Sequence, residues 1–203
     1  MAASKAGFMK DAFILFAITL VSGICLGLVY EITKGPIEQA TIAAANATYR
    51  EVLSTADSFD TLEGSEEKVS ELNASGDLVQ YGNVGVNSIL KGTDANGNVV
   101  GYVINTYSND GFNGLIELSV GVDLNGAITG VGFLHIEDTY SSEAQDIEYV
   151  GQFLGKGKNM LTVTKSDSAT ETEINAISGA TITSKATTNA VNAALYYLHN
   201  YLE

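Results

Sequence analysis

The longest apolar pattern in the chain is an uncharged run of 19 residues at positions 12–30. That length is just enough to cross a bilayer as a helix. Lys5 and Lys10 precede the run, and this charge bias predicts a cytoplasmic N-terminus (residues 1–11) with the remainder outside the cell. The alternative is a cleavable signal peptide, which usually has a shorter apolar stretch and a small-x-small cleavage site. No such site directly follows Tyr30, so we expect a permanent single-pass anchor.

After the anchor, the pattern changes to an amphipathic and then a polar one. Gly35-Pro36 is typical of a helix start, and apolar residues recur at helical spacing from there to about Leu53. Residues 57–76 are acidic and rich in serine, which predicts mostly surface loop with at most one short helix. We therefore interpret residues 31–76 as a membrane-proximal helix and acidic loop, and residues 77–203 as the main domain.

The main domain opens with strand-like alternation. Residues 84–91 and 99–107 flank a loop of turn formers, and residues 116–122 lead through Asn125-Gly126 to a return strand at 128–136. Both patterns predict β-hairpins. A helix at 142–154, a short strand at 161–165 and a last helix to the C-terminus complete the prediction, and an apolar stripe on that last helix should face the sheet. This order predicts an α+β fold with antiparallel hairpins and a C-terminal helix.

Composition narrows the function classes. From Gly35 onward the chain has 22 acidic and 7 basic residues, a net charge of −15, which argues against nucleic acid as a partner and against binding to anionic lipid surfaces. Cys25, the only cysteine, lies inside the predicted anchor, so the exposed part has no disulfide framework or cysteine-ligated cluster. With only His135 and His199 as histidines, a histidine-rich metal site is not expected either. Any redox chemistry would rest on an organic cofactor.

The main candidate for chemistry is a small-residue turn at positions 175–184, just before the last helix. Gly179 and Ala180 let backbone amides approach a ligand, and the first amides of a helix favour an anion such as phosphate. Four hydroxyls surround the turn, those of Ser178, Thr181, Thr183 and Ser184. The alternative is a serine- and threonine-rich helix cap that binds nothing. The residues by themselves leave both interpretations open.

The segment Ser178-Gly179-Ala180-Thr181, followed by Ile182-Thr183-Ser184-Lys185, resembles the flavinylation motif of FMN-binding domains in Rnf and Na⁺-pumping NADH:quinone oxidoreductase complexes. In its short length the chain is more similar to the G subunits of Rnf complexes than to their longer homologues in the Na⁺-pumping NADH:quinone oxidoreductase. The resemblance implies FMN held covalently as a phosphoester of Thr181, with the neighbouring residues of the turn around it. It also implies a separate flavin transferase that makes the bond, because no residue obviously serves Thr181 as a base. Lys185, one helical turn on, is better explained as a solvated charge, which could also pair with the phosphate.

Other segments share this resemblance. Residues 110–116 look like the family's glycine-rich strand, which implies that Gly114 and Leu115 lie near the cofactor. Asp138 and Thr139 match the first two positions of a Glu-Thr-Pro-Gly-Leu-Gly loop expected near the flavin ring, but the rest of that loop is replaced. A second departure is Asn175, where the family usually has aspartate.

These observations lead to one main hypothesis and two alternatives. The main hypothesis is an electron-transfer subunit of a membrane-bound Rnf-type ferredoxin:NAD⁺ oxidoreductase, coupled to Na⁺ or H⁺ movement. Such a subunit works with other membrane subunits and catalyses no complete reaction alone. The alternatives are a stand-alone extracytoplasmic flavoprotein and an anchored binding module without a cofactor. His135 could hydrogen-bond a flavin or simply be a half-buried polar residue, whereas the helix dipole is the simpler explanation of His199.

Overall fold

The computed structural model describes residues 5–166 and 170–202. It divides into two compact units, residues 1–44 and residues 45–203. The predicted start of the main domain at residue 77 lies well inside the second unit, and it stays a prediction for where the FMN-binding part begins.

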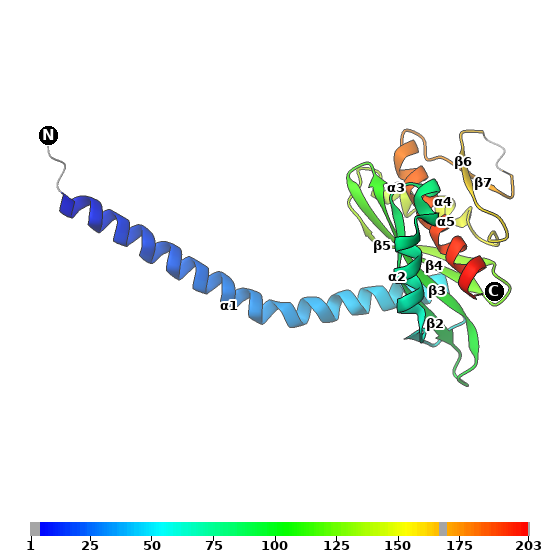
Figure 1. The fold of residues 1–203 in the computed structure, drawn as a ribbon, viewed down its shortest axis with the longest axis horizontal. Helices are drawn as coiled ribbons and strands as arrows, with labels where there is room; N and C mark the ends of the chain where they lie inside the picture. The colour runs from blue at the N-terminus through cyan, green and yellow to red at the C-terminus, as the bar shows by residue number, and fades with distance from the viewer. Residues whose placement is uncertain (1–4, 167–169, 203) are drawn as a thin grey trace. The chain divides into compact units, whose positions relative to one another are not determined.

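Helix α1 runs from Lys5 to Val52 without interruption (Figure 1). The predicted helix start at Gly35-Pro36 is therefore wrong, because Pro36 lies inside the helix. A proline removes one backbone hydrogen bond, and good helix formers on both sides can keep the helix continuous across that local loss. The predicted end near Leu53 is confirmed. Within the described residues, the span Phe8–Val52 is the one helix long and apolar enough to cross a membrane, by length and composition.

An antiparallel sheet of five strands forms the centre of the second unit, in the order β1-β2-β3-β4-β5. The strands are β1 (Ser58–Thr61), β2 (Val84–Thr93), β3 (Val99–Gly111), β4 (Gly114–Asp123) and β5 (Ile128–Ile136). Both predicted hairpins are confirmed. The prediction for residues 57–76 is wrong in part, since they hold strand β1; the one short helix allowed for there is α2 (Ser65–Ser75), and η1 (Asp77–Tyr81) follows it.

Two hairpin turns of the sheet use the same device. In the β2–β3 turn, Asp94 Oδ1 accepts hydrogen bonds from the backbone N–H groups of Asn96 (2.9 Å) and Asn98 (2.8 Å). In the β4–β5 turn, Asp123 Oδ1 accepts from those of Asn125 (2.8 Å) and Ala127 (2.9 Å). Each turn thus satisfies its own backbone with a single aspartate.

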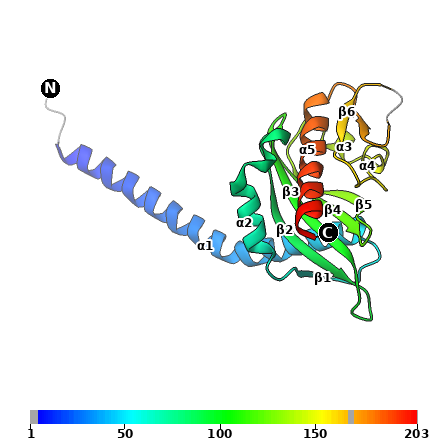
Figure 2. The ribbon, with the colours of Figure 1, turned by 45° about the vertical axis from the view of Figure 1, so that its right-hand side comes forward.

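Helix α5 (Thr181–Tyr197), continued by η2 (Leu198–Leu202), packs on β2, β3 and β4 (Figure 2). The predicted apolar stripe is buried at Val191, Ala194, Leu195 and Leu198. This stripe joins buried sheet residues such as Ile104 in the main core. The last helix and its packing are therefore confirmed, and the core fixes α5 against the sheet.

The end of α1 is seated on a second set of sheet residues. A Cβ added at Gly130 would lie 2.6 Å from Val52 Cα, and one added at Gly132 would lie 2.5 Å from Thr48 Cγ2. A Cβ at Gly121 would likewise collide with the Val52 carbonyl. The Thr129 hydroxyl donates to that same carbonyl at 2.5 Å. Glycine is needed here for the close approach of helix and sheet.

The segment between β5 and α5 differs from prediction at one point. A single helix was expected at 142–154, but two short ones form, α3 (Ser141–Ala144) and α4 (Ile147–Gly151). Asp146 separates them because its backbone is extended (φ −62°, ψ 136°) and its side chain accepts from Glu148 N, so it caps a new helix. Strands β6 (Thr162–Thr164) and β7 (Glu173–Asn175) then form a small parallel sheet, and β7 leads into the turn before α5.

Candidate functional site

The turn between β7 and α5 is a tight bend held by its own backbone. Ala180 N donates to Ile177 O at 3.0 Å, and Gly179 takes a left-handed φ of +80° that favours glycine. A Cβ at Gly179 would lie 3.1 Å from the hydroxyl of Tyr140. Gly179 is thus required both by the turn and by the neighbouring tyrosine.

The four hydroxyls of the turn have different roles. Ser184 Oγ donates to Ala180 O (2.9 Å) and accepts from Ile177 N (2.9 Å), so it holds the bend. Thr183 Oγ1 donates to Asp138 Oδ2 at 2.6 Å and is buried. Ser178 and Thr181 make no hydrogen bond through their hydroxyls to any residue that the structure describes. Two of the four predicted ligand hydroxyls are therefore structural, and two remain open to a ligand.

The first turn of α5 has no side-chain cap. Its N-cap residue is Ala180, whose methyl group cannot accept a hydrogen bond. Among the described residues, no acceptor meets the backbone N–H groups of Thr181, Ile182 and Thr183. Unsatisfied amides at the positive end of a helix dipole are suited to an anion. The simple interpretation of this segment as a serine- and threonine-rich cap does not fit, because none of those side chains caps the helix.

Asp138 links the turn to the β3–β4 hairpin. Besides the Thr183 hydroxyl, its Oδ2 accepts from Phe112 N at 3.3 Å, and the side chain is 8% exposed. The structure therefore places Asp138 at the site, in a supporting role. Thr139, by contrast, is exposed.

Gly114 and Leu115 lie at the start of β4, where Gly114 pairs with Gly111. Neither lines a pocket that Thr181 lines. The neighbouring hairpin residue Phe112 does line one of these pockets, and the proximity of Gly114 and Leu115 to the cofactor stays a prediction.

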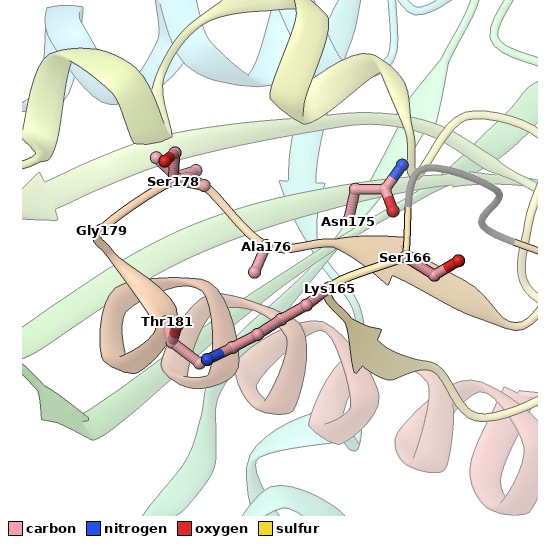
Figure 3. A pocket seen from close by; sticks show the side chains of 8 residues that line it. Lys165, Ser166, Asn175, Ala176, Ser178, Gly179 and Thr181 are labelled. Atoms are coloured by element: carbon pink, nitrogen blue, oxygen red, sulfur yellow. The ribbon is translucent and has the colours of Figure 1, made fainter.

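Two pockets meet at Thr181. The larger, of about 430 Å³, is lined by Lys165, Ser166 and residues of the turn (Asn175, Ala176, Ile177, Ser178, Gly179 and Thr181). In Figure 3 the side chain of Lys165 extends along the pocket and ends beside Thr181. The smaller, of about 250 Å³, lies between Phe112, Tyr140 and residues 179–183. The volume of the larger pocket is typical of a small-molecule site.

Asn175, one of the residues that line the larger pocket, carries an unsatisfied acceptor. Its Oδ1 is buried and has no hydrogen-bond partner among the described residues. Its backbone is tied by a hydrogen bond from Asn175 N to Gln152 Oε1 at 2.7 Å. Asn175 is therefore not the cap of α5.

On the other side of the 175–178 segment lies a pocket of about 560 Å³ with three carboxylates, those of Glu143, Asp146 and Glu148. Its acidic lining does not suit a phosphate. Tyr149, at its edge, donates to Ser184 O at 3.3 Å, and burial raises the pKa of its phenol to about 12. Tyr149 thus stays protonated at neutral pH, and its hydroxyl can donate to the backbone of the first turn of α5.

Sequence reasoning missed Lys165, Phe112 and Tyr140. The signal for Lys165 was weak, because only the parallel pairing of β6 with β7 brings its end of β6 beside the turn. Lys185 is exposed, as expected of a solvated charge, and lines neither pocket at Thr181.

The two histidines lie outside both pockets at Thr181. His135 lies on β5 with its Nε2 3.8 Å from Glu137 Oε1. His199 Nε2 is 2.7 Å from Gly157 O, so a specific hydrogen bond holds it in addition to the helix dipole.

The residues of this site lie within a segment that matches a known protein family. The family described as FMN-binding domain matches residues 111–196, which include Phe112, Asp138, Lys165 and the whole turn. A solved structure, NqrC of Shewanella oneidensis, is similar with a TM-score of 0.45 and 21% identity, over 53% of this chain and 54% of that one.

Curated relatives match along most of the chain. The G subunit of the Na⁺-translocating ferredoxin:NAD⁺ oxidoreductase complex of Acetobacterium woodii is 30% identical over 198 residues, 94% of this chain and 91% of the relative. The G subunit of the proton-translocating ferredoxin:NAD⁺ oxidoreductase complex of Clostridium ljungdahlii is 31% identical over 92% of both chains. The G subunit of an ion-translocating oxidoreductase complex of Methanosarcina acetivorans is 29% identical over 91% of this chain and 90% of the relative. The chain therefore belongs to the G subunit family of ion-translocating ferredoxin:NAD⁺ oxidoreductase (Rnf-type) complexes, with an FMN-binding domain in its C-terminal part.

Proposed function

We propose that this protein is a membrane-anchored electron-transfer subunit of an Rnf-type ferredoxin:NAD⁺ oxidoreductase, and that it carries FMN as a phosphoester of Thr181. The observation that carries the proposal is the position of Thr181. It is the first residue of an uncapped helix, it opens onto two pockets, and it lies within the range matched by the FMN-binding family.

The residues around Thr181 fit the parts of FMN. The free amides at the start of α5 suit a phosphate. The pocket between Phe112 and Tyr140 offers aromatic surface for a flat ring. FMN supplies the redox chemistry, and the protein supplies binding and orientation.

Covalent attachment requires a partner enzyme. In the proposed step the Thr181 oxygen attacks the flavin-side phosphorus of FAD, a threonine–phosphorus ester forms, and the bond to the AMP phosphate breaks with AMP leaving. The proton of the hydroxyl passes to a base on a flavin transferase. A hydroxyl needs such a base to become a good nucleophile, and no described histidine, aspartate or glutamate hydrogen-bonds to Thr181.

The anchor and its charges support a single-pass topology with the flavin domain outside the cell. Lys5 and Lys10 precede the apolar segment of α1, as expected for a cytoplasmic N-terminus. A covalent bond would then retain FMN where a lost cofactor could not be replaced from the cytoplasm. Partners would be the other membrane subunits of the complex. The coupling ion stays open as Na⁺ or H⁺, since relatives of similar identity are named for each.

The test is intact mass and flavin fluorescence after denaturation, on the full-length chain produced in its native host. The wild type should carry one FMN, and Thr181→Val should carry none. Ser178→Ala is the matched control, because Ser178 has the other open hydroxyl of the pocket, and it should keep its flavin. Flavin retained by Thr181→Val, or a wild type without flavin in a host that flavinylates other proteins, would refute the attachment site. Co-purification with integral membrane subunits separates the complex from a stand-alone flavoprotein.

A further inference from the structure

Lys165 has no partner in the described part of the chain. It makes no hydrogen bond or ion pair there, as is also true of the exposed Lys185, whereas Lys156 Nζ donates to Thr170 O at 2.9 Å and to Glu171 O at 3.0 Å. Lys165 is also the one charged residue among the described residues that line the larger pocket. The domain has a net charge of −15, yet the described residues that line this pocket include no carboxylate, so the lysine there favours an anion.

The fold sets the position of this cation. Strands β6 and β7 run parallel with Thr164 opposite Asn175, so Lys165 and Asn175 lie at the same end of the small sheet. Ala176 N continues the pairing with a hydrogen bond to Thr164 O at 2.8 Å. From that edge the Lys165 side chain points toward Thr181, which lines the same pocket (Figure 3). Asn175 is an amide, so no carboxylate at this position neutralises the lysine.

We propose that Lys165 is the positioning residue for the flavin phosphate: its ammonium group pairs with the phosphate oxygens while the amides at the start of α5 bind them from the other side. This inference rests on the proposed function of Thr181. It adds a residue that holds the phosphate before the ester forms, and it assigns that task to Lys165 rather than to Lys185. A charge-assisted pair of this kind acts on the phosphate and leaves the ring free.

The test compares two flavins that differ only in the phosphate. Binding of FMN and of riboflavin to the full-length, unflavinylated chain in detergent is measured by quenching of flavin fluorescence, without any transferase. Wild type should bind FMN more tightly than riboflavin. Lys165→Met should weaken FMN binding roughly fivefold to tenfold and leave riboflavin binding unchanged. Lys165→Arg should restore most of the preference, since it keeps the charge.

The matched control is Lys185→Met, which removes a lysine near the same turn but outside its pockets and should leave both affinities at the wild-type value. Salt gives a second readout, because the FMN preference of the wild type should fall with ionic strength while that of Lys165→Met should not change. Lys165→Gln offers the same comparison if the methionine variant loses its thermal unfolding transition.

The inference is overturned if wild type binds FMN and riboflavin equally, binds neither, or keeps its FMN preference in Lys165→Met. The proposed function fails separately, if Thr181→Val still becomes covalently flavinylated by a transferase supplied with FAD. If Thr181 is flavinylated but FMN affinity is the same in wild type and Lys165→Met, the proposed function stands and the role of Lys165 is refuted.

Discussion

The turns of this molecule differ in what they do with their backbone polar groups. The two hairpin turns satisfy theirs internally, through Asp94 and Asp123. The turn before α5 is built from residues of similar size and polarity, yet its helix begins at Ala180 with no side-chain cap, and the nearby Asn175 Oδ1 is unpartnered. Small polar residues therefore do not by themselves mark a binding site. The distinguishing property is the hydrogen-bonding capacity that the fold leaves unused.

The largest loss of stability should come from substitution of Asp138. Its carboxylate accepts hydrogen bonds at the turn before α5, as those of Asp94 and Asp123 do in the hairpin turns. Asp138→Ala leaves the buried Thr183 hydroxyl and Phe112 N without an acceptor, so we expect a loss of about 2–3 kcal/mol in unfolding free energy. Thermal melting of the full-length chain measures it. Asp138→Asn, which keeps an acceptor, should recover part of the loss, and an alanine variant as stable as wild type would contradict this role.

The next test gives the free backbone amides at the start of α5 a hydrogen-bond acceptor from the protein itself. Ala180→Ser supplies an N-cap hydroxyl to the free amides of α5, and it should stabilise the flavin-free chain by about 0.5–1 kcal/mol. Because that hydroxyl competes with the phosphate, FMN affinity should fall roughly twofold to fivefold. The control is Ala176→Ser, the same change in the same pocket but away from the helix start. If Ala180→Ser were to raise FMN affinity, the amides would not be the anion site.

The smallest effect on FMN affinity should come from the hairpin turns. Asp123→Ala removes acceptors for two backbone amides and should cost about 1 kcal/mol of stability, with no change in FMN affinity. Asp94→Ala removes the same kind of acceptor and should likewise lower stability without changing FMN affinity. A loss of FMN binding in either variant would break the contrast between the two kinds of turn.

The same aspartates give a pH dependence of defined sign. Hydrogen bonds from Asn98 lower the pKa of Asp94; at Asp123, partial burial opposes the effect, but the amides of Ala127 and Asn125 lower the pKa. A lowered pKa in the folded state gives stability that is complete above the unfolded value of about 3.9 and is lost as the pH falls through the folded value. The stability difference between wild type and Asp123→Ala should thus be constant near neutral pH and shrink below about pH 4. A difference that grows in acid would contradict the assignment.

The sequence predicts the hairpins and α5 because their signals are local. Residues 116–136 alternate with period two around Asn125-Gly126, and the stripe from Val191 to Leu198 has helical spacing, so neither depends on a distant partner. β1 was missed because it is four residues long with a single apolar side chain, Phe59, and it is defined by its pairing with β2.

The site was predictable only in part, for a similar reason. The residues of the turn are contiguous, so their chemistry can be recognised in the sequence. Which of their hydroxyls make structural hydrogen bonds and which stay open cannot be recognised in the sequence, because Thr183 donates to Asp138, 45 residues away. Lys165 reaches the site through the parallel pairing of β6 and β7, and such pairing between separated segments leaves little trace in a local pattern.

The seat of α1 on Gly121, Gly130 and Gly132 has a practical consequence for preparing a soluble fragment of this protein. Cutting the chain after the last residue of the helix would uncover a glycine-lined groove and leave the Thr129 hydroxyl without the carbonyl it now meets. A fragment intended for electrochemistry or crystallisation should therefore begin near residue 45, so that the final two turns of the helix stay packed against these glycines.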